Sequence, residues 1–377
     1  MRPYQICTNC VMDTTDARIV FDEKGICDHC NTFYKKILPI WEAKKKNQGR
    51  LMELAEEIRR AANKREFDCI VGISGGVDSS YLTYVAKEVM GLRPLVFHVD
   101  TGWNSQESVN NIEVLLEKLG LELYTEVIDW DEMRDLQLAF FKAGVPHIDT
   151  PQDHAIFAAM YKFAVKHDIK YILTGANFST ECVRNPVEWM YYQSDSVQLK
   201  DIHRRFGTRA LDRFPTTSIL WHKIWLPYVK GIKVAKPLNY THYVREEATR
   251  LLRIKFGWEP YGEKHFESRF TKFYESYWLY EKFGYDVRRV KYSSLILTGQ
   301  MTRKEALDKL ANPPYDKTQI VHEIEYVAGK LNISVDELQG YLDAPNRTYR
   351  DYKNRAWMYS IGSWIMRGLG LELGGKR

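Results

Sequence analysis

The sequence predicts an α/β protein: a parallel sheet with helices on both faces, an N-terminal zinc ribbon and a C-terminal helical region. The first observation is the alternation of short apolar runs with helical stretches between about residues 67 and 256, which is typical of such sheets. The second is a double Cys-x2-Cys pattern within the first 30 residues. The third is a helical pattern that continues to the end beyond about residue 260.

The composition of the 377-residue chain is that of an ordinary globular protein, with 45% hydrophobic and 27% charged residues. Its length allows two or three domains. We expect a cytoplasmic protein without a membrane partner, because no apolar run is long enough to span a bilayer and the N-terminus lacks the apolar stretch of a secretory signal. The net charge of +5 is too mild to indicate nucleic acid, and it also suits an anionic substrate.

Four of the six cysteines form two close pairs near the N-terminus. They are Cys7, Cys10, Cys27 and Cys30. The spacing C-x2-C-x16-C-x2-C brings four thiolates within reach of one structural zinc ion. Residues 18–26 alternate in polarity around a Lys-Gly turn and predict a hairpin, as in a zinc ribbon. Two disulfides are the alternative, which the lack of a secretory signal disfavours. His29, inside the second pair, is expected to be a bystander.

The remaining elements follow one another in the order expected for a parallel sheet. Expected strands cover residues 67–73, 94–99, 121–127, 171–174 and 233–238. Expected helices cover residues 81–90, 105–119, 131–143, 151–168 and 242–256. The predicted domains are a zinc ribbon (1–32), a helical linker (33–65), an α/β domain (66–258) with an irregular insert (183–230), and a helical C-terminal domain (259–377).

A Ser-Gly-Gly-Val-Asp-Ser-Ser loop at residues 74–80 follows the first expected strand and opens a helix. Gly75 and Gly76 let the backbone approach an anion, and the amides of the helix N-terminus then point toward it. Three hydroxyl donors can join them, from Ser74, Ser79 and Ser80. Asp78 would repel a bare phosphate, so it implies Mg²⁺ between the two. A plain Ser/Gly turn that caps a helix is the alternative.

This loop resembles the PP-loop of the ATP pyrophosphatases, a superfamily that includes asparagine synthetase, GMP synthetase and the tRNA-thiolating enzymes. The similarity covers about residues 67–256 and extends to His98 and Asp100 in Phe-His-Val-Asp, to Leu-Thr-Gly-Ala-Asn at 173–177, and to Lys-Pro-Leu at 236–238. The resemblance implies cleavage of ATP between its α and β phosphates, with transfer of AMP to a substrate oxygen. The residues that it implies for binding ATP and Mg²⁺ are Ser74, Gly75, Gly76, Asp78, Ser79, Ser80, His98, Asp100, Thr174, Gly175 and Asn177.

Nearly the whole chain also resembles the N-acetyl sugar amidotransferases of bacterial surface-polysaccharide and O-antigen pathways. The segments that carry this likeness are residues 6–16, 173–182 and 291–306. The family implies that an N-acetyl group on a nucleotide-linked sugar becomes an acetamidino group. It also implies that ammonia comes from a separate glutaminase subunit through a barrel-type, cyclase-like subunit, similar to the two parts of imidazole glycerol phosphate synthase.

Several side chains are candidates for the chemistry that follows ATP binding. Lys236 can neutralise charge on phosphorus, although it can equally be an ordinary lysine near a strand end. Asp153 and His154 open a helix and can orient the acceptor amide or deprotonate ammonium; for Asp153, plain N-capping is the alternative. Glu181 is open to the same two interpretations. No cysteine has the setting of a glutaminase nucleophile. Four are expected to bind zinc, Cys69 lies within an expected strand, and Cys182 is not placed at a strand-to-helix turn.

The insert and the C-terminal region are rich in aromatic residues. Candidates in the insert for binding the nucleotide or the sugar are Arg184, Trp189, Tyr191, Tyr192, His203, Arg204 and Arg205; packing of the insert on itself is the alternative. The aromatic residues of 270–283 predict either an interface, with a second copy or with the ammonia-supplying partner, or a core cap.

Two other functions compete with the amidotransferase. A tRNA-thiolating enzyme is the main alternative, and the absence of cysteines around residues 150–155 weighs against it. A zinc-ribbon binding module leaves the loop at 74–80 unexplained.

Overall fold

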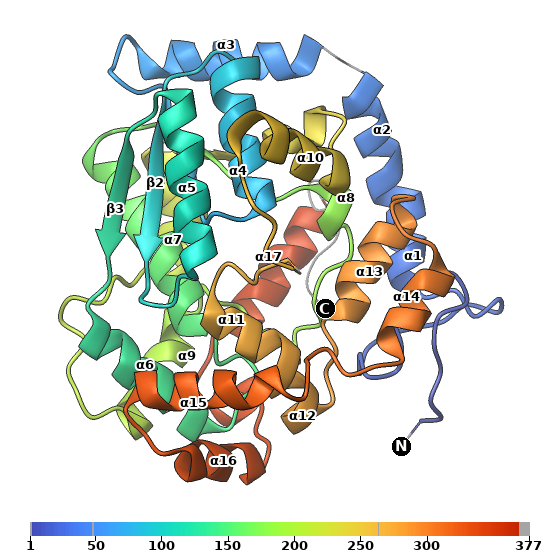
Figure 1. The fold of residues 1–377 in the computed structure, drawn as a ribbon. Coiled ribbons are helices and arrows are strands. Elements are labelled where there is room, and N and C mark those ends of the chain that lie inside the picture. Colours follow the sequence, from blue (N-terminus) through green and yellow to red (C-terminus); the bar gives the residue numbers. More distant parts are fainter. Residues whose placement is uncertain (1, 47–48, 263, 369–377) are drawn as a thin grey trace.

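A five-stranded parallel sheet forms the centre of the computed structural model, which describes residues 2–46, 49–262 and 264–368 (Figure 1). The strand order is β3-β2-β1-β4-β5. The strands are β1 (Cys69–Gly72), β2 (Pro94–Asp100), β3 (Leu123–Val127), β4 (Tyr171–Leu173) and β5 (Lys233–Ala235). Strand order reverses at β1, which pairs with β2 on one side and β4 on the other. Ligands of such sheets bind at the carboxyl ends of the strands beside this reversal.

Helices cover both faces of the sheet, as the sequence predicted. Because side chains alternate along a strand, Cys69 and Val71 face one core, whereas Ile70 and Ile172 face the other. The first core lies beneath α3 (Gly49–Ala62), α4 (Val77–Tyr84), α5 (Gln106–Leu119) and α10 (Arg245–Phe256). The second lies beneath α6 (Trp130–Ala143) and α7 (Thr150–Lys166). The predicted fold class is therefore confirmed.

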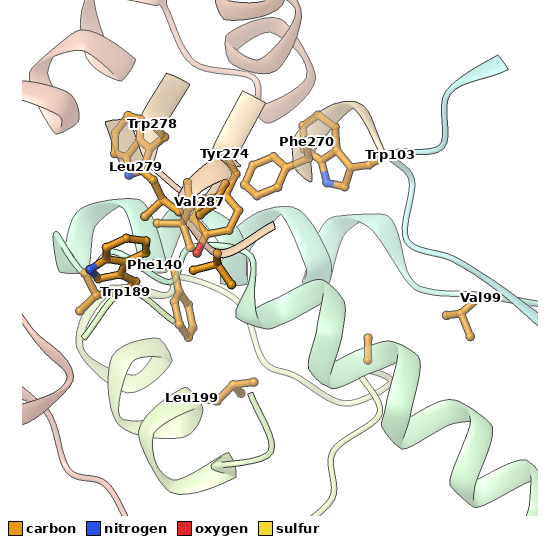
Figure 2. Close-up of a cluster of buried hydrophobic side chains, with 14 of the residues drawn as sticks. Val99, Trp103, Phe140, Trp189, Leu199, Phe270, Tyr274, Trp278, Leu279 and Val287 are labelled. Carbon is orange, nitrogen blue, oxygen red and sulfur yellow. The ribbon is translucent and has the colours of Figure 1, made fainter. Parts of the chain in front are cut away.

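The aromatic segment at residues 269–283 packs into the second core. It consists of α11 (Arg269–Phe273), a π-helical turn (Tyr274–Trp278) and α12 (Leu279–Phe283). Figure 2 shows Phe270 beside Trp103, with Tyr274, Trp278 and Trp189 in the same group of side chains, and each is buried. The structure thus favours the core cap over the interface for this segment.

The C-terminal region continues as helices around this aromatic core. They are α13 (Arg288–Leu297), α14 (Arg303–Leu310), α15 (Gln319–Leu331), α16 (Val335–Asp343) and α17 (Ala356–Gly368). Helix α15 packs on α11. On α17, by contrast, Trp357 and Trp364 are 57% and 74% exposed. No helix in the described part of the chain is long and apolar enough to cross a membrane.

The N-terminal segment packs against α13 rather than standing apart (Figure 1). The Val11 amide donates to Ser293 Oγ at 3.2 Å, and Arg289 forms an ion pair with Asp13. The expected hairpin is reduced to one bridge between Phe21 and Cys27. Then follow α1 (Asp28–Thr32), a π-helical turn (Phe33–Ile37) and α2 (Leu38–Lys46).

The insert at 183–230 is more regular than the sequence predicted. It contains α9 (Ser196–Phe206), which packs on α6, and a π-helical segment (Trp221–Val229). Asp195 caps α9 by accepting from the amides of Val197 and Gln198. Short elements complete the chain: a π-helical turn (Val85–Val89), α8 (Phe178–Glu181) and 3-10 turns (Pro237–Tyr240, Tyr349–Asp351). The last expected strand ends at Ala235, because Pro237 opens a 3-10 turn.

Candidate active site

The loop between β1 and α4 has the shape of an anion cradle. Gly75 has φ +80°, and a Cβ atom there would lie 2.4 Å from the Ser108 carbonyl oxygen, so glycine is required. The Ser79 hydroxyl donates to the Gly76 carbonyl, and it accepts from the Ser74 amide at 3.2 Å. The loop is thus held by its own hydrogen bonds at the N-terminus of α4, where the helix dipole favours an anion.

A small cavity of about 190 Å³ lies over this loop. Four of the predicted loop residues line it, namely Ser74, Gly76, Asp78 and Ser79. Ser80 does not reach it: this side chain is fully buried in the protein, and its hydroxyl has no hydrogen-bond partner among the described residues. The predicted role of Ser80 as a phosphate donor is therefore not supported, because its place on α4 directs it into the core.

Asp78 is held by two residues that no sequence pattern singles out. Lys264 Nζ lies 2.6 Å from Asp78 Oδ2, and the Tyr243 hydroxyl donates to Asp78 Oδ1. Burial raises the pKa of Asp78, but the Lys264 ammonium outweighs that effect and the net pKa is lowered. Asp78 is therefore a carboxylate at neutral pH, as a Mg²⁺ ligand must be.

Further charged groups complete the small cavity. Lys264 also contacts Glu181 Oε1 at 2.6 Å, which brings this predicted candidate beside the loop. The Ser74 hydroxyl donates to Glu267 Oε1 at 3.0 Å, so a carboxylate oxygen already lies against the cradle. Arg245 lines the same cavity. The site thus offers acidic oxygens for a divalent metal and cationic groups for phosphates.

A larger cavity of about 700 Å³ adjoins the small one and shares Ser74, Ser79 and Gly175 with it. This volume is within the range of about 300–1,000 Å³ typical of small-molecule sites. Predicted residues that line it are His98, Asp153, Thr174, Gly175, Asn177, Glu181, Arg184 and Lys236. The structure therefore gathers most of the predicted candidates around one chamber at the carboxyl ends of the strands.

The two candidates at the end of β2 have structural partners. His98 Nε2 accepts from the Asn104 amide at 2.9 Å, so its Nδ1 is the nitrogen that donates to the Ile73 carbonyl, also at 2.9 Å. Asp100 accepts from the Gly102 amide at 2.8 Å and is not among the residues that line the cavity. His98 therefore contributes to the cavity wall, whereas Asp100 shapes the turn beyond it.

The end of β4 approaches the loop closely. A Cβ atom at Gly175 would lie 3.0–3.1 Å from atoms of Asp78, so a larger residue would displace Asp78. Asn177 accepts from the Thr180 amide at 2.9 Å and thereby caps α8. Thr174, which precedes Gly175, also lines the large cavity.

His154 is a correction to the sequence analysis. It is 2% exposed and does not line the large cavity. Its Nε2 accepts from the Thr217 amide at 3.1 Å, and its Nδ1 donates to the Gln193 carbonyl at 2.7 Å. Burial lowers the pKa of His154, which keeps the imidazole neutral. Its environment is therefore that of a packing residue which joins α7 to the insert.

Most aromatic and basic candidates of the insert also have structural roles. Trp189 is fully buried and stacks on Tyr285, and Tyr191 stacks on Tyr349. The others pair as follows: Tyr192 with Tyr359, His203 with Asp135, and both Arg204 and Arg205 with Asp201. Arg184, on the cavity wall, is the insert candidate that remains.

The N-terminal cysteines have the geometry of a zinc site. The ligand atoms of all four lie within 4.8 Å of one another, and three of the Sγ–Sγ separations are 3.6 to 3.8 Å. A tetrahedron with Zn–S bonds of about 2.3 Å has edges of about 3.8 Å. Amides of Asn9, Cys10 and Cys27 donate to Cys7 Sγ, which stabilises thiolate charge. His29 instead contacts Asp16, as a bystander would.

The comparisons with known proteins agree with this site. Residues 267–366 match the C-terminal domain of WbpG-like lipopolysaccharide (LPS) biosynthesis proteins, and residues 51–182 match the NAD synthase family. The chain thus combines a PP-loop ATP pyrophosphatase domain with a C-terminal domain like that of WbpG-like LPS biosynthesis proteins. The predicted family resemblance is thereby confirmed. No curated protein matches the chain significantly.

Three solved structures are similar to this chain at low identity. The U34-tRNA thiolase NcsA from Methanococcus maripaludis, with its 4Fe–4S cluster, is 15% identical over 78% of this chain and 86% of that chain, with a TM-score of 0.32. The NMN synthetase from Francisella tularensis is 14% identical over 59% and 98%, with a TM-score of 0.29. The NH3-dependent NAD synthetase from Campylobacter jejuni subsp. jejuni is 13% identical over 58% and 100%, with a TM-score of 0.28. These similarities are too low to bear on function.

Proposed function

We propose that this protein is an ATP-dependent amidotransferase. It adenylylates the carbonyl oxygen of an N-acetyl group on a nucleotide-linked sugar, and ammonia then replaces that oxygen to give an acetamidino sugar for O-antigen synthesis. The observation that carries the proposal is the junction of the two cavities at Ser74, Ser79 and Gly175. An anion cradle with a metal-binding carboxylate opens there onto a chamber of the size that a sugar acceptor needs.

The chemistry follows from the weakness of an acetamido carbonyl as an electrophile. Its oxygen attacks the α-phosphorus of ATP, the bond to the β-phosphate breaks, and pyrophosphate leaves. The resulting imidate carries AMP on its oxygen. Ammonia then forms a bond to the imidate carbon, and AMP departs with the former amide oxygen. The balance is amide, ammonia and ATP giving amidine, AMP and pyrophosphate.

Each charged group near the loop has a place in this scheme. Asp78 would hold Mg²⁺, which when bound neutralises the phosphates and stabilises pyrophosphate as it leaves. Lys264 and Arg245, which line the small cavity, would bind the β and γ phosphates once ATP competes for the Lys264 ammonium. Lys236 lines the large cavity and would neutralise charge at the α-phosphorus.

The ammonia source in this proposal is a separate glutaminase subunit with a barrel-type, cyclase-like subunit. Burial raises the pKa of Cys182 to about 12, so its thiol is not a ready nucleophile. Cys69 is fully buried within β1, and burial raises its pKa as well. The isolated chain should therefore use free ammonium and fail to use glutamine.

Sulfur transfer to tRNA has less support in the cysteine arrangement. The N-terminal four are the one cysteine-containing metal cluster among the described residues. Cys69 and Cys182 belong to different cores, so they do not supply a second cluster. No observation at the site favours this alternative.

A direct test incubates the purified protein with ATP, Mg²⁺, ammonium chloride and a UDP-diacetamido sugar. Mass spectrometry should show the small mass loss of O replaced by NH, together with AMP and pyrophosphate. The Asp78→Asn variant should lose roughly 10²-fold in rate, because it removes the metal-binding charge. ADP and phosphate as products would overturn the proposal, as would glutamine-dependent turnover by this chain alone.

A further inference from the structure

A pair of carboxylates stands at the start of α7, on the wall of the large cavity. Asp149 immediately precedes the helix and is 7% exposed, and Asp153 follows one turn later. Both line the large cavity, and neither lines the small cavity over the PP-loop. The Thr271 hydroxyl donates to Asp149 Oδ2 at 2.9 Å, and the Gln152 amide donates to Oδ1. Asp149 is therefore fixed in place beside the chamber proposed for the acceptor.

Asp149 differs from the other buried carboxylates of the site in its electrostatics. Asp78 pairs with Lys264, and Glu275 pairs with Lys291. Within residues 2–46, 49–262 and 264–368, no ion pair includes Asp149. Burial first, and then the charge of Asp153, raise the pKa of Asp149 well above its usual range. A bound cation would stabilise the ionised form of such a carboxyl group, whereas without a cation the group takes up a proton more readily.

Tyr274 lies in the π-helical turn that follows α11, three residues after Thr271, whose hydroxyl contacts Asp149. Its side chain is 1% exposed, and its hydroxyl has no hydrogen-bond partner among the described residues. Burial and then the charges of Asp149, Glu275 and Asp153 raise its pKa. Tyr274 is not among the residues that line the large cavity, so it is not a direct ligand for a molecule bound there.

We propose that Asp149, together with Asp153, binds ammonium at this end of the cavity and that Asp149 removes its proton. This inference rests on the amidotransferase function proposed above. Ammonium has four N–H donors and needs few oxygen acceptors, whereas Mg²⁺ and Ca²⁺ need six or more oxygen ligands. Ile156 and Val287, which line the same cavity, are apolar and offer no oxygen ligands, so the cavity suits ammonium better than a divalent cation.

The proton transfer balances without another reactant. Ammonium gives one proton to the Asp149 carboxylate and becomes ammonia, whose lone pair forms the bond to the imidate carbon as AMP leaves. The titratable groups around Asp149 are Asp153 on its own helix, and Glu275 and Tyr274 on the segment that follows Thr271. Glu275 already forms an ion pair with Lys291 at 2.6 Å, so Asp153 is the main neighbouring negative charge.

Binding can be tested without turnover, by thermal unfolding in ammonium chloride and in sodium chloride at equal ionic strength. At ammonium concentrations about tenfold above its dissociation constant, the midpoint of the wild-type protein should rise by about 2 °C above the sodium value. The Asp149→Asn variant should show no such difference. Asp153→Asn removes the second carboxylate of the site at nearly constant volume, and Asp153 is only partly buried, so this variant tests the same site with less risk to folding and should reduce the shift.

Kinetics then separate ammonium binding from ATP binding. Asp149→Asn should raise the KM for ammonium at least tenfold and leave the KM for ATP within about twofold, with partial rescue by Asp149→Glu. Glu181→Gln is the matched control, because this cavity carboxylate pairs with Lys264 beside the PP-loop. It should change the KM for ATP more than the KM for ammonium.

The outcomes distinguish this inference from the function on which it rests. Ammonium stabilisation that depends on Asp149, without any amidine product, would support the site and overturn the proposed function. Amidine formation with an unchanged ammonium KM in Asp149→Asn would overturn the site alone. A raised KM for the sugar and not for ammonium would assign Asp149 to the acceptor instead, and would also reject the inference.

Discussion

At the scale of single residues, Gly75 shows how tightly the anion-binding loop is built. Its positive φ, and the 2.4 Å that would separate a Cβ atom there from the Ser108 carbonyl oxygen, leave no room for a side chain. Gly75→Ala should therefore displace the loop from α5, raise the KM for ATP at least tenfold and lower the free energy of unfolding by about 1–3 kcal/mol. Steady-state kinetics and urea unfolding measure the two effects.

Gly120 provides the matched control for this substitution. It also has a positive φ, of +60°, but a Cβ atom there would have nothing within 4 Å. Gly120→Ala should cost about 1–2 kcal/mol of stability from the backbone alone and leave the KM for ATP unchanged. Equal KM values for ATP in the two variants would contradict the steric role assigned to Gly75.

The loop residues could be found from sequence because they are contiguous and have a characteristic pattern. Lys264 and Tyr243 could not, since they contact Asp78 from positions 186 and 165 residues away, on segments whose own patterns are unremarkable for a site. The incorrect prediction for His154 has a similar cause, because the sequence does not show which way a side chain faces. A histidine beside Asp153 at a helix start looks functional, but helix geometry turns consecutive side chains in different directions, and His154 faces the insert.

At the scale of elements, the N-terminal segment with its four cysteines packs against α13 and α14. Arg303 donates to the Cys7 and Cys10 carbonyls at 2.9 and 3.0 Å, so the metal-binding loop and α14 depend on each other. Cys27→Ser should remove about one zinc per chain and lower the thermal midpoint, because binding energy at such sites is folding energy. Elemental analysis and calorimetry measure both effects.

Cys182→Ala is the control for the zinc prediction. Cys182 is buried near α13 but lies outside the four-cysteine cluster, so its replacement should keep the zinc content of the wild-type protein. Stable disulfides among the four N-terminal cysteines, or zinc retained in Cys27→Ser, would count against the metal site.

Strands and helices with strong periodicity were predicted well, whereas the insert was not. The aromatic and basic residues of 183–230 suggested ligand binding, but α9 depends on Asp195 as a cap and on packing against α6, and neither is visible as periodicity alone. The predicted hairpin of residues 18–26 is present only as a minimal one, with a single antiparallel bridge between Phe21 and Cys27. In a metal-held segment the cysteines supply the order, so a regular ladder is not required.

At the scale of the whole molecule, Glu275 joins the helices of the C-terminal region to the segment that carries Lys264 over the PP-loop. It is 3% exposed and accepts from Lys291 Nζ at 2.6 Å and from His265 Nδ1 at 2.9 Å. Lys291 also donates to the Lys264 carbonyl at 2.9 Å. One buried carboxylate thus ties α13 and the aromatic core to the segment that carries Lys264 over the PP-loop.

The contribution of Glu275 and its contacts with Lys291 and His265 should be visible in the pH dependence of stability. Burial raises the pKa of Glu275, but Lys291 and His265 outweigh it and lower the pKa from 4.5 to about 2. Because the folded pKa is the lower one, the stabilisation is fully present above pH 4.5 and is lost as the pH falls toward 2. Glu275→Gln should lower the free energy of unfolding at pH 7 by about 3 kcal/mol, and the difference from wild type should shrink across that window.

Urea unfolding at a series of pH values measures this difference, with Glu246→Gln as the control. The Glu246 side chain is 88% exposed and lies 4.0 Å from Arg250, so its replacement should change stability little at any pH. A penalty for Glu275→Gln that stayed constant from neutral pH down to the acid end of the window would mean that the side chain matters for packing rather than charge. A penalty that falls with pH, accompanied by a higher KM for ATP at neutral pH, would show that the helical region positions Lys264 through this carboxylate.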